Sequence, residues 1–323
     1  MSERQKVSFD KSAIFREDRN HYRNIETYRD DLFRKFSRNM TSLLESNRPK
    51  RFSSNKGLLD TRKLYRHSFD DNVFYKKTST PHSDTTFLFL VDASGSMSQN
   101  VLEYNDYYID RIEMCGAITS AFAKANKTVL NNKIKMEVFT KTVGGTIMNG
   151  FVKGYVPILS RVFSNITGDT DWDKLIRLNT SAPVKVDGRE DGSYTPEFLL
   201  LPTLMEWCRK NITTRNMVII NLTDGEVVHC FLDKETVTDE DTQGNGYSRR
   251  TGVRARNTDT KSLRIKYLRG IPNTTLFMGH GGEYYQNQMK DIYGTNAICA
   301  DGEAFEGEFF KVLNNLLKDE YNA

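Results

Sequence analysis

The residues best suited to chemistry in this sequence carry oxygen atoms and lie beside its most apolar stretches. They are Asp92, Ser94, Ser96, Thr195 and Asp224. The first three follow an apolar run at 86–91, the last follows another at 216–222, and the threonine stands directly before an expected helix. Hydroxyl and carboxylate oxygens are ligands that Mg²⁺ prefers, together with several waters. The set therefore predicts a site for Mg²⁺, or for Mn²⁺ or Ca²⁺ in its place.

These residues also have a simpler structural explanation. Asp and Ser are favoured at helix N-caps, so Asp92, Ser94 and Ser96 could each begin the next helix. That explanation leaves Thr195 and Asp224 as coincidences, so we favour the metal site. Thr170 is a second candidate for the threonine position, but Thr195 is preferred because it opens an apolar helix.

Catalytic interpretations find less support in the same residues. Ser94 is not part of a G-x-S-x-G turn, which presents the nucleophile of α/β-hydrolases. Asp92 lacks the following D-x-T that accompanies an aspartyl-phosphate nucleophile, and no carboxylate–histidine set stands out as acid and base. A site rich in neutral hydroxyls is expected to bind rather than cleave. We therefore expect a chain that is not an enzyme by itself.

The elements that position these residues alternate between strand and helix. Apolar strands are expected at 86–91, 135–140, 155–164, 216–222, 274–278 and 297–300. Helices are expected at 19–44, 102–127, 171–178, 196–210, 258–269, 284–293 and 305–321. This alternation predicts an α/β fold with a mostly parallel sheet covered by helices on both faces. In such folds ligands gather at the carboxyl ends of the strands, where the strand order reverses.

The motifs and their order resemble a known family. D-x-S-x-S after one buried strand, T-P at a helix start and T-D-G after another strand are similar to the von Willebrand factor A (VWA) domain and its metal-ion-dependent adhesion site (MIDAS). The resemblance runs from about residue 86 to the C-terminus and implies a Rossmann-like fold. It implies that Ser94, Ser96 and Thr195 give hydroxyls to Mg²⁺, and that Asp92 and Asp224 act directly or through water. One coordination position would remain for a carboxylate of a partner protein.

A second resemblance lies upstream, at 57–77. The pattern G-x-L-D-x-x-x-L-x-R at 57–66, followed by FYKK, is similar to the segment that precedes the A domain in cobaltochelatase CobT-type subunits. Those subunits work with a MoxR-like AAA+ ATPase of the CobS type, which the resemblance implies as the partner here. It also implies an alternative role, as an accessory subunit of a cobalt or magnesium chelatase. CobT-like proteins occur in large tailed phages too, where the compartment would be the host cytoplasm.

The N-terminal quarter carries the positive charge of the chain. The whole sequence has a net charge of +4, whereas residues 1–85 have 19 Lys and Arg against 12 Asp and Glu, or 19 − 12 = +7. We expect a basic, largely helical arm at 1–84 and a VWA domain at 85–323 with inserted loops at 141–194 and 226–257. A solvated helical arm is favoured, although one apolar face could pack on a partner or on the main domain. Nucleic-acid binding by this arm is a further alternative.

Several classes of protein are excluded by composition. The longest apolar runs are far below the roughly 20 residues that span a bilayer, so no membrane association is expected. The N-terminus is charged and has no apolar signal core. The four cysteines form no C-x-x-C pair, which argues against a zinc ribbon. Their scatter fits reduced thiols, so the expected location is the cytoplasm.

Overall fold

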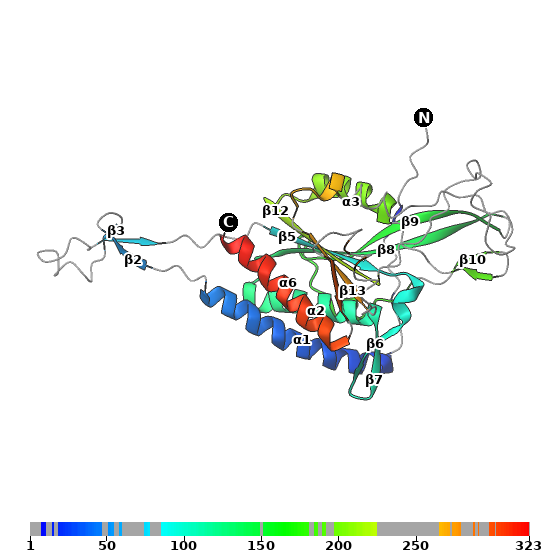
Figure 1. Cartoon of the computed structure of the whole chain (residues 1–323), viewed down its shortest axis with the longest axis horizontal. Helices are drawn as coiled ribbons and strands as arrows, with labels where there is room; N and C mark the ends of the chain where they lie inside the picture. Colours follow the sequence, from blue (N-terminus) through cyan, green and yellow to red (C-terminus); the bar gives the residue numbers. More distant parts are fainter. Residues whose placement is uncertain are drawn as a thin grey trace, which may run out of the picture.

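The structure is a computed structural model of the 323-residue chain. It describes residues 8–10, 15, 19–46, 51–54, 58–59, 74–77, 85–148, 151–180, 184–186, 189–191, 197–224, 265–271, 273–278, 287, 290, 297–300 and 302–322. Within these residues a central sheet lies between helices (Figure 1). No described helix is both long and apolar enough to cross a membrane.

The central sheet has seven strands in the order β1-β9-β8-β5-β12-β13-β14. Their bounds are Ser8–Asp10 (β1), Thr85–Asp92 (β5), Lys135–Met148 (β8), Phe151–Ser164 (β9), Asn216–Thr223 (β12), Asn273–Met278 (β13) and Ala297–Ala300 (β14). All neighbouring pairs are parallel except β8 with β9. The predicted α/β class with a mostly parallel sheet is therefore confirmed.

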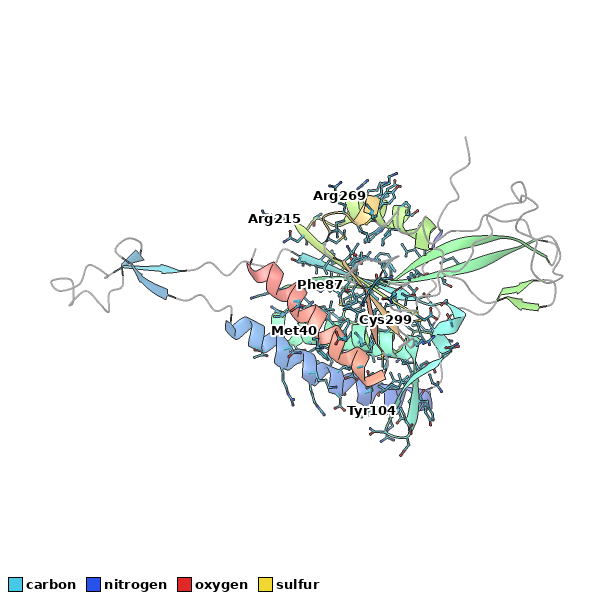
Figure 2. The ribbon with its side chains drawn as sticks, in the orientation of Figure 1. Met40, Phe87, Tyr104, Arg215, Arg269 and Cys299 are labelled. Carbon is cyan, nitrogen blue, oxygen red and sulfur yellow. The ribbon has the colours of Figure 1, made fainter. Side chains whose placement is uncertain are left out.

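Helices cover both faces of the sheet, as expected (Figure 1). Helices α1 (Arg19–Ser46), α2 (Arg111–Leu130) and α6 (Gly302–Asn322) lie on one face, and α3 (Glu197–Asn211) lies on the other. Strand β5 shows why both layers are needed, because its side chains alternate between two apolar clusters. Phe87 and Phe89 join the cluster with α1, α2 and α6, while Leu88 and Leu90 join the cluster with α3. Figure 2 shows side chains filling these layers, with Phe87 and Met40 labelled in the first.

Helix α1 packs on the main domain and is not a solvated arm. Its inward face contributes six buried side chains: Tyr22, Ile25, Tyr28, Leu32, Phe36 and Met40. The ring of Phe36 meets the rings of Phe122 on α2 and Phe309 on α6 at 5.7 and 5.8 Å between centroids. The expected solvated arm is thus corrected for this helix, because its apolar stripe is covered by α2 and α6.

A β-hairpin takes the place of the first part of the helix expected at 102–127. Strands β6 (Asn100–Tyr104) and β7 (Tyr107–Asp110) pair antiparallel, and α2 begins only at Arg111. The two turn residues, Asn105 and Asp106, have φ values of 50° and 60°. Two consecutive positive φ angles characterise the type I′ turn, which Asn and Asp tolerate. Asp110 and Glu113 then form a capping box that starts the helix.

The range 141–194 was expected as an inserted loop with a strand at 155–164 and a short helix at 171–178 inside it, and most of the range is regular structure. Strands β8 and β9 form a long antiparallel hairpin, and the 3₁₀ helix η3 (Trp172–Arg177) follows. Two short strands, β10 (Val184–Val186) and β11 (Arg189–Asp191), pair further on. The expected loop at 226–257 lies outside the described residues.

The CobT-like segment at 57–77 is described only in part. Strands β2 (Arg51–Ser54), β3 (Leu58–Leu59) and β4 (Phe74–Lys77) form a three-stranded antiparallel sheet in the order β2-β4-β3. Of the two helices expected at 258–269 and 284–293, the described residues include a helical stretch at 265–268 and two single positions, 287 and 290.

Candidate functional site

The topology brings the two predicted acidic positions to the same edge of the sheet. From β5 the chain passes through α2 to β8 on one side, and later through α3 to β12 on the other. Strand order therefore reverses beside β5, which is where open α/β sheets bind ligands. The register pairs Val91 of β5 with Leu222 of β12, so Asp92 lies beside Thr223 and close to Asp224.

Asp92 is fully buried, and two hydrogen bonds to other described residues hold it. Its Oδ1 accepts the backbone N–H of Ser94 at 2.9 Å, and its Oδ2 accepts the hydroxyl of Thr223 at 2.6 Å. The first bond forms the turn that leaves β5, and the second ties that turn to the end of β12. These bonds fix the orientation of the carboxylate within the protein.

Ser94 and Ser96 bring their hydroxyls together in the loop after β5. Their Oγ atoms are 3.1 Å apart, and a short 3₁₀ helix, η2 (Gly95–Ser98), follows Ser94. Two neighbouring ligands of an octahedral Mg²⁺ at its usual bond length would be about 2.9 Å apart. The spacing of the two hydroxyls therefore fits adjacent positions on such an ion.

Asp224 is paired with a buried arginine at the start of α2. Arg111 Nη1 lies 3.3 Å from Asp224 Oδ2 and 3.3 Å from the carbonyl oxygen of Ser96. The two side chains are 5% and 1% exposed, so this ion pair is shielded from water. One guanidinium nitrogen thus links the loop after β5 to the residue that follows β12.

A second buried cation reaches the same edge from β8. Register pairs Lys141 with Asp92, and Lys141 is 2% exposed. Burial raises the pKa of Asp92; the charge of Lys141 opposes that rise and the charge of Asp224 adds to it. Burial raises the pKa of the Cys115 thiol as well, and the charges of Asp92 and Asp224 add to this rise. A buried thiol with a raised pKa stays neutral and packs as a small apolar group.

Four of the five predicted site residues come together here: Asp92, Ser94, Ser96 and Asp224. The fifth, Thr195, lies outside the described residues. Its rival Thr170 is exposed and follows β9, whose end pairs with Glu137 near the start of β8, at the opposite edge of the sheet. Among the described residues no group of three or more His, Cys, Asp or Glu side chains could hold a metal ion, so any metal here would depend on the serine hydroxyls.

Three polar residues of this edge were not predicted: Arg111, Lys141 and Thr223. Lys141 and Thr223 follow or end buried strands, so the rule that singled out Asp92 could have found both. Arg111 carried no such signal, because it lay inside the expected helix at 102–127. Its position at the base of the β6–β7 hairpin became visible only with the fold.

Comparisons with known proteins leave the family open. No family model and no curated protein matches the chain. Among solved structures, the pilus adhesin SpaC from Lactobacillus rhamnosus GG in its open conformation shares 16% identity with a TM-score of 0.41, over 73% of this chain and 30% of that chain. Proximal thread matrix protein 1 from the mussel byssus shares 13% with a TM-score of 0.37, over 73% and 46%. The chain thus spans less than half the length of either protein.

Proposed function

We propose that this chain is a binding module of the VWA type, without catalytic activity of its own, that docks a carboxylate of a partner protein through Mg²⁺. One observation carries the proposal. The buried carboxylate of Asp92, the paired hydroxyls of Ser94 and Ser96, and Asp224 meet at the ends of two neighbouring parallel strands. Mn²⁺ or Ca²⁺ could take the same place, because all three are bound by oxygen ligands.

The donor set fits a MIDAS-like metal site. Ser94 and Ser96 would hold Mg²⁺ through their hydroxyls, and Asp92 and Asp224 would act directly or through water. When bound, the ion would supply a coordination position for an acidic side chain of the partner. Asp92 is oriented in advance by Ser94 and Thr223, so little ordering of the loop is needed when a ligand arrives. Thr195 would complete the set.

The partner that we propose is an AAA+ ATPase of the MoxR or CobS type. The support is the CobT-like pattern at 57–77 together with the metal edge. In this arrangement the ATPase performs the work, and the present chain couples it to a client. The chelatase alternative gains no support from any contact among the described residues.

Nucleic-acid binding through the basic N-terminal arm is a further alternative, and two basic side chains of helix α1 are engaged by carboxylates of the same chain. Arg29 on α1 is buried and pairs with Asp30 on the same helix and with Asp173 on η3. Lys35 pairs with Glu306 on α6. Arg29, which is buried, therefore has less charge to offer to phosphates, whereas Lys35 is about half exposed.

Ser96 and Ser98 lie two residues apart in the chain, and only the first is a proposed metal ligand, so they allow a matched test of the proposal. Ser96→Ala removes a proposed ligand, whereas Ser98→Ala removes an exposed hydroxyl that bonds only the Gly95 carbonyl among the described residues. Tagged full-length protein would be used to recover an AAA+ ATPase from its native host lysate, with Mg²⁺ or with EDTA. We expect recovery by wild type and Ser98→Ala in Mg²⁺ only, and none by Ser96→Ala. Recovery that ignores both EDTA and Ser96→Ala would refute docking through the metal.

A further inference from the structure

Arg111 is the feature of this edge that the proposed metal site does not explain. It is the first residue of α2 and is 4% exposed. Its Nη1 bonds Asp224 and the carbonyl of Ser96, while its Nε is buried and has no hydrogen-bond partner among the described residues. A buried guanidinium is thus held against a carboxylate that the proposed site needs.

Among the described residues, four charged side chains of this edge balance one another. Asp92 and Asp224 contribute two negative charges, and Arg111 and Lys141 contribute two positive ones, all on side chains that are nearly or fully buried. A divalent cation added to these four described side chains would give the group a net charge of +2. Repulsion between charges is strong where water is largely excluded. A metal ion at this edge would therefore compete with positively charged side chains for the same carboxylates.

We propose that Arg111 competes with the divalent cation for Asp224 and so sets a low metal affinity. The inference rests on the proposed function, since it assumes a metal beside Ser94 and Ser96. Without a metal, Arg111 neutralises Asp224. With a metal, both cations act on the same carboxylate, so the presence of one weakens the hold of the other. A partner carboxylate would reduce the excess positive charge, and metal and partner would then bind cooperatively, each strengthening the other.

The test is the affinity of the full-length protein for Mn²⁺, measured by electron paramagnetic resonance of the free ion. Arg111→Gln removes the competing charge and is expected to bind Mn²⁺ at least tenfold more tightly than wild type. Lys127→Gln, at the exposed far end of the same helix, removes an equal charge and is expected to bind as wild type does. Added Mn²⁺ should also raise the unfolding temperature of Arg111→Gln more than that of wild type, because it replaces the lost partner of Asp224.

The outcomes separate this inference from the proposed function. Mn²⁺ binding by wild type with equal or weaker binding by Arg111→Gln would overturn the inference alone. Absence of Mn²⁺ binding in every variant would overturn both. If Arg111→Gln does not fold, the double variant Arg111→Gln with Asp224→Asn replaces it, because this variant removes both charges of the ion pair. We expect this double variant to bind within about threefold of wild type, since Asp224 is already engaged by Arg111; a loss of tenfold or more would refute the competition.

Discussion

The same substitution at two helical glycines should change stability in opposite directions. Gly116 lies in α2, and a Cβ added there would stand 2.3 Å from the carbonyl oxygen of Leu175 in η3. Gly307 lies in α6, is exposed, and a Cβ there would meet nothing within 4 Å. Gly116→Ala therefore tests the packing of α2 on η3, and Gly307→Ala is its matched control.

The expected magnitudes follow from two opposing effects. Alanine is favoured over glycine in a helix by about 1 kcal/mol, so Gly307→Ala should raise the free energy of unfolding by about 0.5–1 kcal/mol. At Gly116 the added carbon would be about 1 Å inside ordinary contact with a backbone atom, which cannot rotate away. Overpacking costs about 1–3 kcal/mol, and a clash with backbone belongs at the upper end. After the gain in helix propensity, Gly116→Ala should be destabilised by about 1–2 kcal/mol.

Urea unfolding followed by circular dichroism measures both changes. The midpoints should move in opposite directions while the slopes stay equal, because neither change alters the surface exposed on unfolding. If Gly116→Ala were stabilised as much as Gly307→Ala, helix α2 would not approach η3 as closely as the structure has it. Helix α2, which carries Arg111, would then lie farther from η3.

Three further predictions concern the packing around α1 and α2. Phe36→Ala should lower the free energy of unfolding by about 3–5 kcal/mol in the same urea assay; a loss below about 1 kcal/mol would place α1 outside the core. Tyr104→Phe removes a hydrogen bond to Asp31 and should cost about 1 kcal/mol at pH 7. Burial and Asp31 raise the pKa of Tyr104 to about 12, above its unfolded value near 10. The difference in the free energy of unfolding between wild type and Tyr104→Phe should therefore be largest below pH 10 and should decrease as the pH rises to 12. A difference that does not change with pH would contradict the hydrogen bond between Tyr104 and Asp31. Burial raises the pKa of Cys115 and Cys208, so a thiol reagent at pH 8 should label neither before unfolding, as mass spectrometry can check.

The buried strands and their acidic ends were predictable because each property is local in sequence. A strand covered on both faces must be apolar throughout, and this made β5 and β12 stand out as continuous runs. The residue that follows such a strand reaches the carboxyl edge of a parallel sheet wherever the strand lies in the order. Asp92 and Asp224 could therefore be assigned to one edge before the strand order was known.

The remaining parts depended on signals that the apolar pattern concealed. The spacing of apolar residues continues from β7 into α2, so one helix was predicted over 102–127. The Asn105–Asp106 pair and the capping box of Asp110 and Glu113 mark the true boundary, and both were readable. The sequence signal for the β8–β9 hairpin was weak, because consecutive glycines at 144–145 lie within it. Charged residues at element ends are usually solvated, so nothing local marked Arg111 as buried, whereas Lys141 could be found as the residue that follows a buried strand.

The buried ion pair of Arg111 and Asp224 is a poor means of stabilising the fold. Its contact is 3.3 Å long, and Arg111 Nε lacks a partner among the described residues, so the desolvation of the guanidinium is incompletely compensated there. Removing one partner should cost about 3–5 kcal/mol, because the other charge stays buried alone, whereas replacing both by apolar residues of similar size is often neutral or stabilising.

Arg111→Met with Asp224→Leu should therefore unfold at a urea concentration at or above that of wild type, and Arg111→Met alone well below it. Such a result would mean that the pair costs stability at the place where the strand order reverses, which is expected of charges kept for a ligand. A double variant as unstable as the single one would contradict this reasoning. The ion pair would then serve to hold the loop after β5 against β12, and the case for Arg111 as a competitor of the metal would lose its physical basis.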